Sequence, residues 1–367
     1  MLHSIRFSHD RPTELSNSGS ASKEEQAEFL TGLLHRSVRV RPEIFPGIAD
    51  VVRITEERLL GCGVRPDVFV HADTNMQACC FAPARYDHPV ILVTSAMVER
   101  LTSDELASVI GHEIGHSVYK HQGQNYEGLE GAERLKVLAD IRSAEISADR
   151  VGLLACRDVK TAISALIKTS TGLSSEHIRF DIQGFMQQFK ELTENGPNMN
   201  EAMSTHPLFL LRIRALISFS NSKDYYRIIG QEGKGSLSLD EVNRSVLRDL
   251  RKISGLSLDD LDNEIILRIL VLASFAVFAA DGKFSKDEQE FFQETFGDLD
   301  TSAEMQIVQD KGVSGIVFEL RRLIALLGGV SEEDRRRMKT FFSVLEDSFP
   351  RDHTQPLRAA LNSMGYI

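Results

Sequence analysis

The stretch Thr102–His121, TSDELASVIGHEIGHSVYKH, carries the strongest structural and chemical signals in the 367-residue chain. Thr102 and Glu105 have the spacing of a capping box, which predicts the first turn of a helix. Apolar residues then repeat at helical spacing, at Leu106, Val109, Ile110 and Ile114. We therefore expect one amphipathic helix over these residues.

Two histidines on this helix have the spacing of metal ligands. His112 and His116 are four residues apart, so their rings lie on one face with Cβ atoms about 6 Å apart, and one tetrahedral metal can bind both. Glu113 lies beside them, where it can take a proton from a water that the metal activates. The pattern HEIGH is therefore typical of a zinc metallopeptidase, although two solvated histidines on a surface helix could also produce it.

A second helical pattern, over residues 132–156, carries two carboxylates one turn apart. Glu145 follows His116 by 29 residues, which leaves room for a loop and a second packed helix that brings its carboxylate to the metal. Asp149 lies on the same face as Glu145 and could accept the free N–H of a ligand histidine. The alternative is a solvated acidic face that is paired with nearby arginines.

Short β-branched runs at 67–71 and 89–94 predict two strands, and residues 76–82 between them predict an edge strand. An edge strand beside the helix that carries His112 and His116 could hold an extended peptide through its unpaired backbone N–H and C=O groups. A plain structural strand is the alternative. Residues 122–131 contain three glycines without periodicity, which favours a loop over the metal helix.

Three motifs together resemble those of the HtpX and CAAX-prenyl-endopeptidase family of gluzincin peptidases. They are HEIGH, the pair Glu145 and Asp149, and THPLFLLRI over residues 205–213, so the resemblance covers about residues 65–216. Taken with the spacing above, it predicts a zincin-type fold and one zinc ion per chain, with the ligands His112, His116 and Glu145.

The resemblance also implies residues that bind substrate. In that family a strand containing an asparagine lies over the cleft, and the matching residues here are Asn75, Met76, Gln77, Ala78, Cys79 and Cys80. His206 and Arg212, in the THPLFLLRI motif, are implied to bind substrate or to stabilise the oxyanion of the tetrahedral intermediate. Alternatively, His206 caps a helix and Arg212 forms an internal salt bridge to a helix end.

The C-terminal part of the chain has helical patterns and almost no strand signal. These patterns fall at 259–280, 285–296, 302–311, 315–327, 331–348 and 356–363. The segment FAVFAADGKFSKDEQEFF resembles part of the TerB-like helical domain of tellurite-resistance proteins. That resemblance implies an interaction or regulatory role. Asp281 is a weak candidate for binding a divalent ion, although the segment lacks the ligand pattern of an EF-hand. Ser285 has the features of a helix N-cap.

We therefore expect an α+β protein. Residues 1–60 would form an N-terminal arm and scaffold helices, and residues 61–220 a mainly helical peptidase domain with a small β-sheet. Residues 221–256, which are polar and contain one helical pattern near 239–253, would form a linker. Residues 257–367 would form an all-α bundle of the TerB-like type.

Composition argues against several functions. The net charge is −11 and no basic tract is present, so we expect no binding to nucleic acid or to an anionic membrane. The longest uncharged apolar run, residues 269–280, is too short to span a bilayer, and the N-terminus lacks the apolar segment of a secretory signal. The four cysteines show no paired metal-ligand spacing. A cytoplasmic location is therefore expected.

The sequence thus predicts a soluble zinc endopeptidase that acts on peptides or unfolded proteins, with a C-terminal domain that could bind a protein partner. One alternative is a latent or non-catalytic zinc-binding chaperone or adaptor. In that case Cys79 or Cys80 could occupy the fourth zinc position and silence the site. Another alternative makes the second half the main functional unit, which recruits a partner for the peptidase to process.

Overall fold

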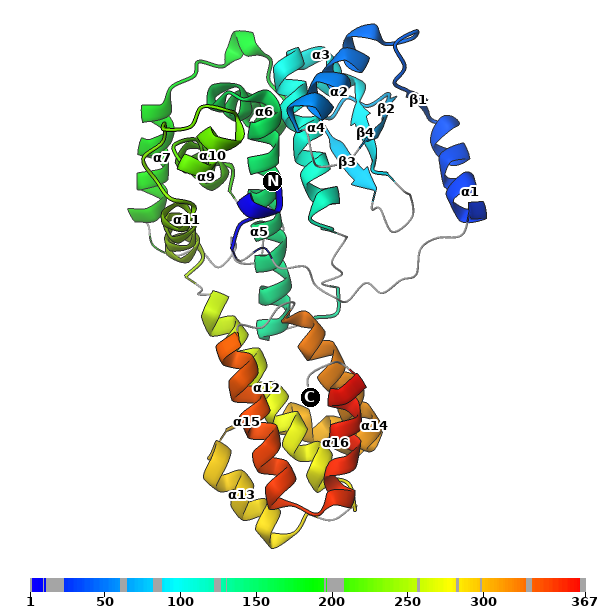
Figure 1. The fold of residues 1–367 in the computed structure, drawn as a ribbon, viewed down its shortest axis with the longest axis vertical. Helices are drawn as coiled ribbons and strands as arrows, with labels where there is room; N and C mark the ends of the chain where they lie inside the picture. Colours follow the sequence, from blue (N-terminus) through cyan, green and yellow to red (C-terminus); the bar gives the residue numbers. More distant parts are fainter. Residues whose placement is uncertain are drawn as a thin grey trace. The chain divides into compact units, whose positions relative to one another are not determined.

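The computed structural model describes most of the chain. The described residues are 2–8, 10, 23–59, 65–81, 88–121, 127–129, 131–194, 196, 208–255, 258–281, 284–297, 299–327 and 332–363. They form two compact units, shown in Figure 1. The first contains the described residues of 1–12, 17–126 and 138–256, and the second contains those of 127–137 and 257–367. Helices dominate both units and one small sheet lies in the first, which confirms the expected α+β class.

The first unit contains one four-stranded sheet and a larger number of helices. Its elements in chain order are η1 (Leu2–Ile5), α1 (Lys23–Leu34), β1 (Ser37–Arg39), α2 (Pro46–Arg58), β2 (Asp67–His71), β3 (Ala78–Phe81), β4 (Val90–Thr94), α3 (Ser95–Arg100), α4 (Ser103–Val118), α5 (Gly131–Cys156), α6 (Val159–Thr171), η3 (Ser175–His177), α7 (Ile182–Glu194), α9 (Phe209–Ser220), α10 (Lys223–Ile228) and α11 (Leu239–Ser254). The first seven residues of α5 cluster with the second unit.

The sheet has the strand order β1-β2-β4-β3, so β3 is an edge strand. β2 and β4 run parallel, while β1 and β3 pair antiparallel with β2 and β4 respectively. Ile91 and Val93 of β4 are fully buried because β4 has a neighbour on each side and helices against it. In Figure 1, α4 runs beside β3, and the two elements are in contact.

Helix α4 forms as the sequence predicts. Thr102 is its N-cap and completes the capping box with Glu105 in both directions. The helix ends in a Schellman motif, in which the N–H of His121 donates to the carbonyl of His116 at 2.9 Å and the N–H of Lys120 donates to Ser117 at 3.1 Å. Lys120 adopts the left-handed conformation that this motif requires, with φ of 58°. His121 therefore turns back beside the last turn of α4.

Glycines allow α4 and α5 to pack unusually closely. A Cβ atom on Gly111 would lie 2.4 Å from Cβ of Ala155, and one on Gly115 would lie 2.9 Å from Cα of Ala148. On α5, a Cβ on Gly152 would lie 2.7 Å from the carbonyl oxygen of Ser108. The glycines in and just before HEIGH thus bring the backbone of α5 against the histidine helix.

The sequence analysis missed several elements of the first unit. Strand β1 and helices α6 and α7 carried patterns that were not assigned. The stretch 221–256, expected to be a linker with one helical pattern near 239–253, contains α10 as well as α11, and it clusters with the first unit. Helix α11 buries its apolar face, including Val242 and Val246. Its periodicity was visible in the sequence, but the surface that covers it comes from α7 and α9.

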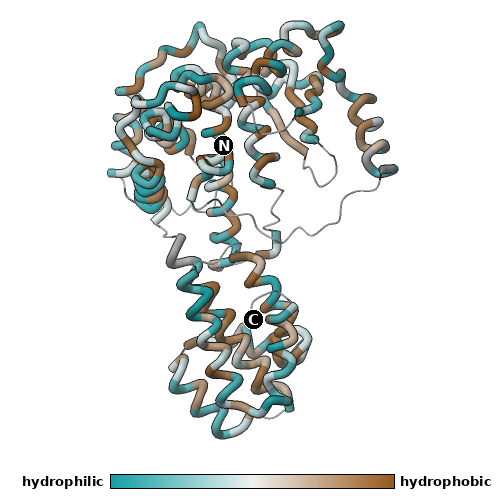
Figure 2. Tube along the Cα trace, viewed as in Figure 1, coloured by the Kyte–Doolittle hydropathy of each residue, from teal (hydrophilic) through white to brown (hydrophobic). Residues whose placement is uncertain are grey.

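The second unit is helical throughout the part that the structure describes. It contains α12 (Leu258–Phe278), α13 (Lys286–Phe296), α14 (Ser302–Leu326), α15 (Glu332–Ser348) and α16 (Arg351–Ser363). Ser285 caps α13 as expected. Two helices were expected in place of α14, whose helical conformation is interrupted at Gly312 with φ of 60°. Helix α16 begins before Pro356, which lies within it. Figure 2 shows hydrophobic and hydrophilic residues alternating along these helices.

Candidate metal centre

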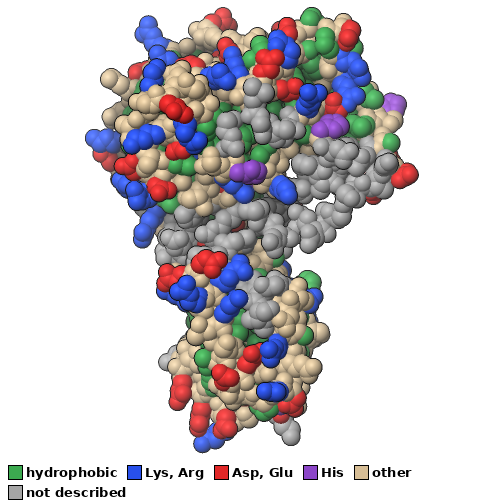
Figure 3. Space-filling model, in the orientation of Figure 1, with side chains coloured by type: hydrophobic (Ala, Val, Ile, Leu, Met, Phe, Trp, Pro, Cys, Tyr) green, Lys and Arg blue, Asp and Glu red, His purple; other side chains and the backbone are tan. Residues whose placement is uncertain are grey.

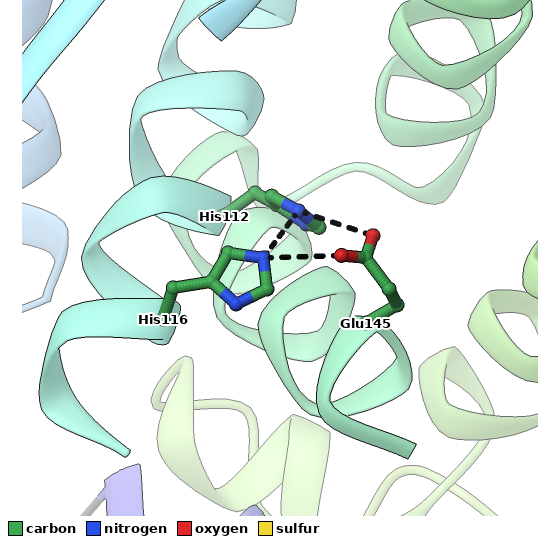
Figure 4. A group of neighbouring side chains, drawn as sticks. All are labelled: His112, His116 and Glu145. Atoms are coloured by element: carbon green, nitrogen blue, oxygen red, sulfur yellow. Dashed lines mark hydrogen bonds and ion pairs between the residues drawn. The ribbon is translucent and has the colours of Figure 1, made fainter. Parts of the chain in front are cut away.

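Three side chains from α4 and α5 converge on one point, as Figure 4 shows. Nε2 of His112 lies 3.0 Å from Nε2 of His116, and each of these atoms also faces a carboxylate oxygen of Glu145, at 3.6 and 3.4 Å respectively. Ligand atoms bound about 2.1 Å from a tetrahedral ion lie about 3.4 Å from one another. The spacing and the donor set of two imidazoles and one carboxylate therefore fit a zinc-sized ion.

Asp149 contacts His112 of this group, and Arg212 contacts both Asp149 and Glu145. Nδ1 of His112 lies 3.0 Å from Oδ1 of Asp149. Arg212 on α9 donates to both oxygens of Asp149, at 2.6 and 2.8 Å, and pairs with Glu145 at 3.2 Å. Burial alone would raise the pKa of Asp149, but Arg212 and His112 hold that pKa below its usual range. The carboxylate is therefore kept charged and can orient His112 with Nε2 toward the other ligands.

A second series of polar contacts leads away from His116. Its Nδ1 lies 2.9 Å from Nδ1 of His121, and Nε2 of His121 lies 2.9 Å from both carboxylate oxygens of Asp10. Arg6 in turn donates to Asp10 at 3.0 and 3.2 Å. The side chains of His121 and Asp10 are only 8% and 2% exposed. These contacts therefore form in a place that is largely closed to water.

Burial and neighbouring charges shift the pKa values of His116, His121 and Asp10. Burial lowers the pKa of His116, but in the metal-free protein its interaction with Glu145 and the charge of Glu113 outweigh burial and raise that pKa. Burial also lowers the pKa of His121, and here it outweighs the opposing effect of Asp10. Burial raises the pKa of Asp10 as well, but His121 and Arg6 lower it to about 2 overall. Asp10 is thus ionised at neutral pH.

The three converging side chains lie in a cavity of about 760 Å³. Glu113 lines it, as do five consecutive residues from Met76 to Cys80, which include the start of the edge strand β3. Asn75 is described but is not among the lining residues. Apolar or small residues also line the cavity, namely Val109, Gly152, Ala162, Ala165, Leu166 and Leu216. The cavity thus combines three acidic side chains, Glu113, Glu145 and Asp149, with histidines that include His112, His116 and His121, and with a strand that lies at the edge of the sheet in the described part of the chain.

Other residues singled out in the sequence have different surroundings. Arg212 lines the cavity, but its guanidinium is held by Asp149 and Glu145, which matches the internal salt bridge more closely than a free oxyanion contact. His206 lies outside the described residues. In the described part of the chain, the one group of three possible ligand side chains is His112, His116 and Glu145. Neither Asp281 nor the cysteines of β3 join such a group there.

Sequence reasoning missed His121 and Asp10. His121 is five residues after His116, and an uninterrupted helix would have turned it to a different face. Asp10 is 111 residues from His121 in the chain. No local sequence pattern marks either residue, because the left-handed residue after α4 is Lys120 and not a glycine.

Two wider properties of the molecule bear on the expected partners. Over the face shown in Figure 3, Lys and Arg side chains are interspersed with Asp and Glu side chains. Among the described helices, none is both long enough and apolar enough to cross a membrane.

Comparisons with known proteins point to the same part of the chain. Residues 66–139 and 134–219 match the model of Peptidase family M48. Over 195 residues the chain is 27% identical to the plastoglobule-localized metallopeptidase 48, chloroplastic, of Arabidopsis thaliana. That alignment covers 47% of this chain and 56% of the relative, so it spans little more than half of the relative's length. No solved structure gave a significant match. The matched residues include those that build the candidate metal centre.

Proposed function

We propose that the chain is a zinc-dependent endopeptidase, with His112, His116 and Glu145 as the zinc ligands. The observation that carries this proposal is the convergence of the three ligand atoms within the cavity that Glu113 and β3 also line. The donor set suits zinc, which prefers imidazole and carboxylate in tetrahedral sites. A zinc ion bound there would polarise the scissile carbonyl and lower the pKa of water.

Glu113 is the proposed general base. It follows His112 directly on α4, it is 7% exposed, and it lines the cavity without joining the three converging ligand atoms. Its carboxylate would take the proton of the attacking water and then pass it to the leaving amine. Arg212 holds Asp149 and Glu145 in place, and Asp149 orients His112. His206 remains a proposed oxyanion contact on the basis of the sequence motif.

The edge strand β3 is the proposed binding site for an extended peptide. It pairs with β4 on one side, and its residues Ala78, Cys79 and Cys80 line the cavity. A substrate strand could add to the unpaired edge, so that backbone hydrogen bonds place a peptide bond beside Glu113. Recognition of this kind depends mainly on main-chain groups, which suits peptides and unfolded segments of varied sequence.

The substitution Glu113→Gln tests the mechanism. Gln cannot accept the water's proton but keeps the size of Glu, so the variant should bind one zinc per chain and lose casein cleavage by at least 100-fold. His116→Ala is the matched comparison, because it should lose both zinc and cleavage. Metal content by mass spectrometry and cleavage are measured on the same samples. Undiminished cleavage by zinc-loaded Glu113→Gln protein would refute the proposed base.

The latent-site alternative is tested by substitution of the cysteines. In the variant Cys79→Ser, Cys80→Ser, a rise in cleavage would support a thiol that silences the site, and unchanged cleavage would exclude it. For the second unit we propose an accessory role of the TerB-like type, in interaction with a protein partner. The cytoplasmic location also stays a prediction.

A further inference from the structure

We infer that His121 and Asp10 are positioning residues for the proposed metal ligand His116, so that the N-terminal segment, residues 2–8 and 10, completes the metal centre. This inference rests on the proposed zinc site. It assigns to His116 a partner that acts as Asp149 does for His112, but through an additional imidazole.

The contacts fix the positions of the protons along this series. A histidine that binds a metal through Nε2 carries its proton on Nδ1, and Nδ1 of His116 points at Nδ1 of His121, 2.9 Å away. His121 must therefore accept at Nδ1 and carry its own proton on Nε2. That proton is donated to Asp10, whose two oxygens are equally close to Nε2. Each group thus has one orientation and one tautomer that satisfy all of the contacts.

The N-terminal segment is anchored independently of these contacts. Ile5 and Phe7 are fully buried. The N–H of Phe7 donates to Oγ of Ser147 at 3.0 Å, and Arg150 donates to the carbonyl of Ile5 at 2.8 Å. The hydroxyl of Tyr119 donates to the carbonyl of Leu2 at 2.7 Å. These contacts attach the segment to both α5 and the end of α4, in addition to the contacts of Asp10.

The consequence is that ligand geometry depends on a carboxylate that is distant in sequence. Removing the partner of a ligand histidine typically weakens metal binding 10- to 100-fold, because the ring loses its preferred orientation and some of its basicity. His121→Phe keeps a ring of similar size but cannot accept from His116. Asp10→Ala leaves the His116–His121 contact without its outer partner, while Asp10→Asn keeps an acceptor oxygen and loses the charge.

Zinc affinity, measured by competition with a chromophoric chelator, tests the inference on the full-length chain. His121→Phe and Asp10→Ala should bind zinc 10- to 100-fold more weakly than the wild type, and Asp10→Asn should show a smaller loss. Tyr119→Phe is the matched control, because it removes an anchor of the N-terminal segment and leaves the polar contacts intact. Its zinc affinity should equal that of the wild type. The absorption spectrum of the Co²⁺-loaded proteins should change only for His121→Phe and the Asp10 variants.

Two results would overturn the inference while leaving the zinc peptidase in place. One is zinc affinity within 2-fold of the wild type in both His121→Phe and Asp10→Ala. The other is an equal loss in Tyr119→Phe, which would indicate a general effect of the segment on the fold. If His121→Phe does not fold, Asp10→Asn against Tyr119→Phe decides the question. A wild-type protein that binds no zinc would overturn the metal centre itself, and the inference with it.

Discussion

Gly115 on α4 packs against the backbone of Ala148 on α5, so closely that a Cβ atom at Gly115 would lie 2.9 Å from Cα of Ala148. Gly115 directly precedes His116 on α4, and Ala148 lies between Glu145 and Asp149 in the sequence of α5. Because the nearby atom belongs to the backbone, a side chain cannot move aside to make room. The glycine within HEIGH thus sets the distance at which Glu145 meets the histidines.

We therefore expect Gly115→Ala to separate the two helices and weaken zinc binding at least 10-fold, with a loss of stability of about 1 to 3 kcal/mol from overpacking. Chelator competition and urea unfolding measure the two effects. Gly47→Ala in α2 is the matched control, since a Cβ there meets nothing within 4 Å. An affinity equal to that of the wild type in Gly115→Ala would mean that the helix spacing does not limit the metal site.

Asp149 and Arg212 should behave as one unit. Asp149→Asn removes the charge that faces both His112 and Arg212, so we expect a 10- to 100-fold loss of zinc affinity. In the double variant Asp149→Asn, Arg212→Gln, the loss of zinc affinity should be clearly smaller than the sum of the losses in the two single variants. Each single variant leaves the other, buried side chain without this partner, and the double variant does not. A double-variant cycle on zinc affinity checks this. Strict additivity would argue that the two side chains act separately.

Removing Glu105 from its buried pair with Lys168 should destabilise the fold strongly. Glu105 completes the capping box of α4 and also accepts from Nζ of Lys168 at 2.7 Å, where the lysine side chain is 1% exposed. Glu105→Ala leaves that ammonium buried without this partner, so we expect a loss of about 3 to 5 kcal/mol in the free energy of unfolding. Glu57→Ala removes an exposed i,i+4 pair with Arg53 and should lower the free energy of unfolding far less. Similar losses of unfolding free energy in the two variants would contradict the expectation that breaking the buried pair destabilises the protein more than breaking the exposed pair.

Acid should destabilise the metal-free protein partly through Asp10. The pKa of Asp10 falls from 3.8 to about 2 on folding, so its carboxylate contributes stability above pH 4 that is lost as the pH falls toward 2. A shift of this size corresponds to about 2 kcal/mol. Urea unfolding between pH 2 and 6 should show a smaller loss of stability for Asp10→Asn than for the wild type. Parallel curves would show that Asp10 does not contribute in this way.

Much of the first unit could be read from local patterns. The capping box, the i,i+4 spacing of the histidines and the β-branched runs act over a few residues, and they yielded α4, two inner strands and the edge strand β3. Helices α6 and α7 were not predicted, although each of them also forms within one continuous stretch of the sequence. Residues 221–256 were expected to be a linker with one helix, and the structure shows that helix burying one face against neighbours from elsewhere in the chain.

The sequence by itself determined the histidine helix, the candidate ligands and the α+β class, because the hydrogen bonds within one helix and the side-chain periodicity of a helix or a strand are local. Only the tertiary structure decided how close α5 comes to α4, that Arg212 joins Asp149, and that Asp10 reaches His121. Those contacts join residues up to 111 positions apart. Their distances depend on how buried surfaces fit together, and no periodicity along the chain records that fit.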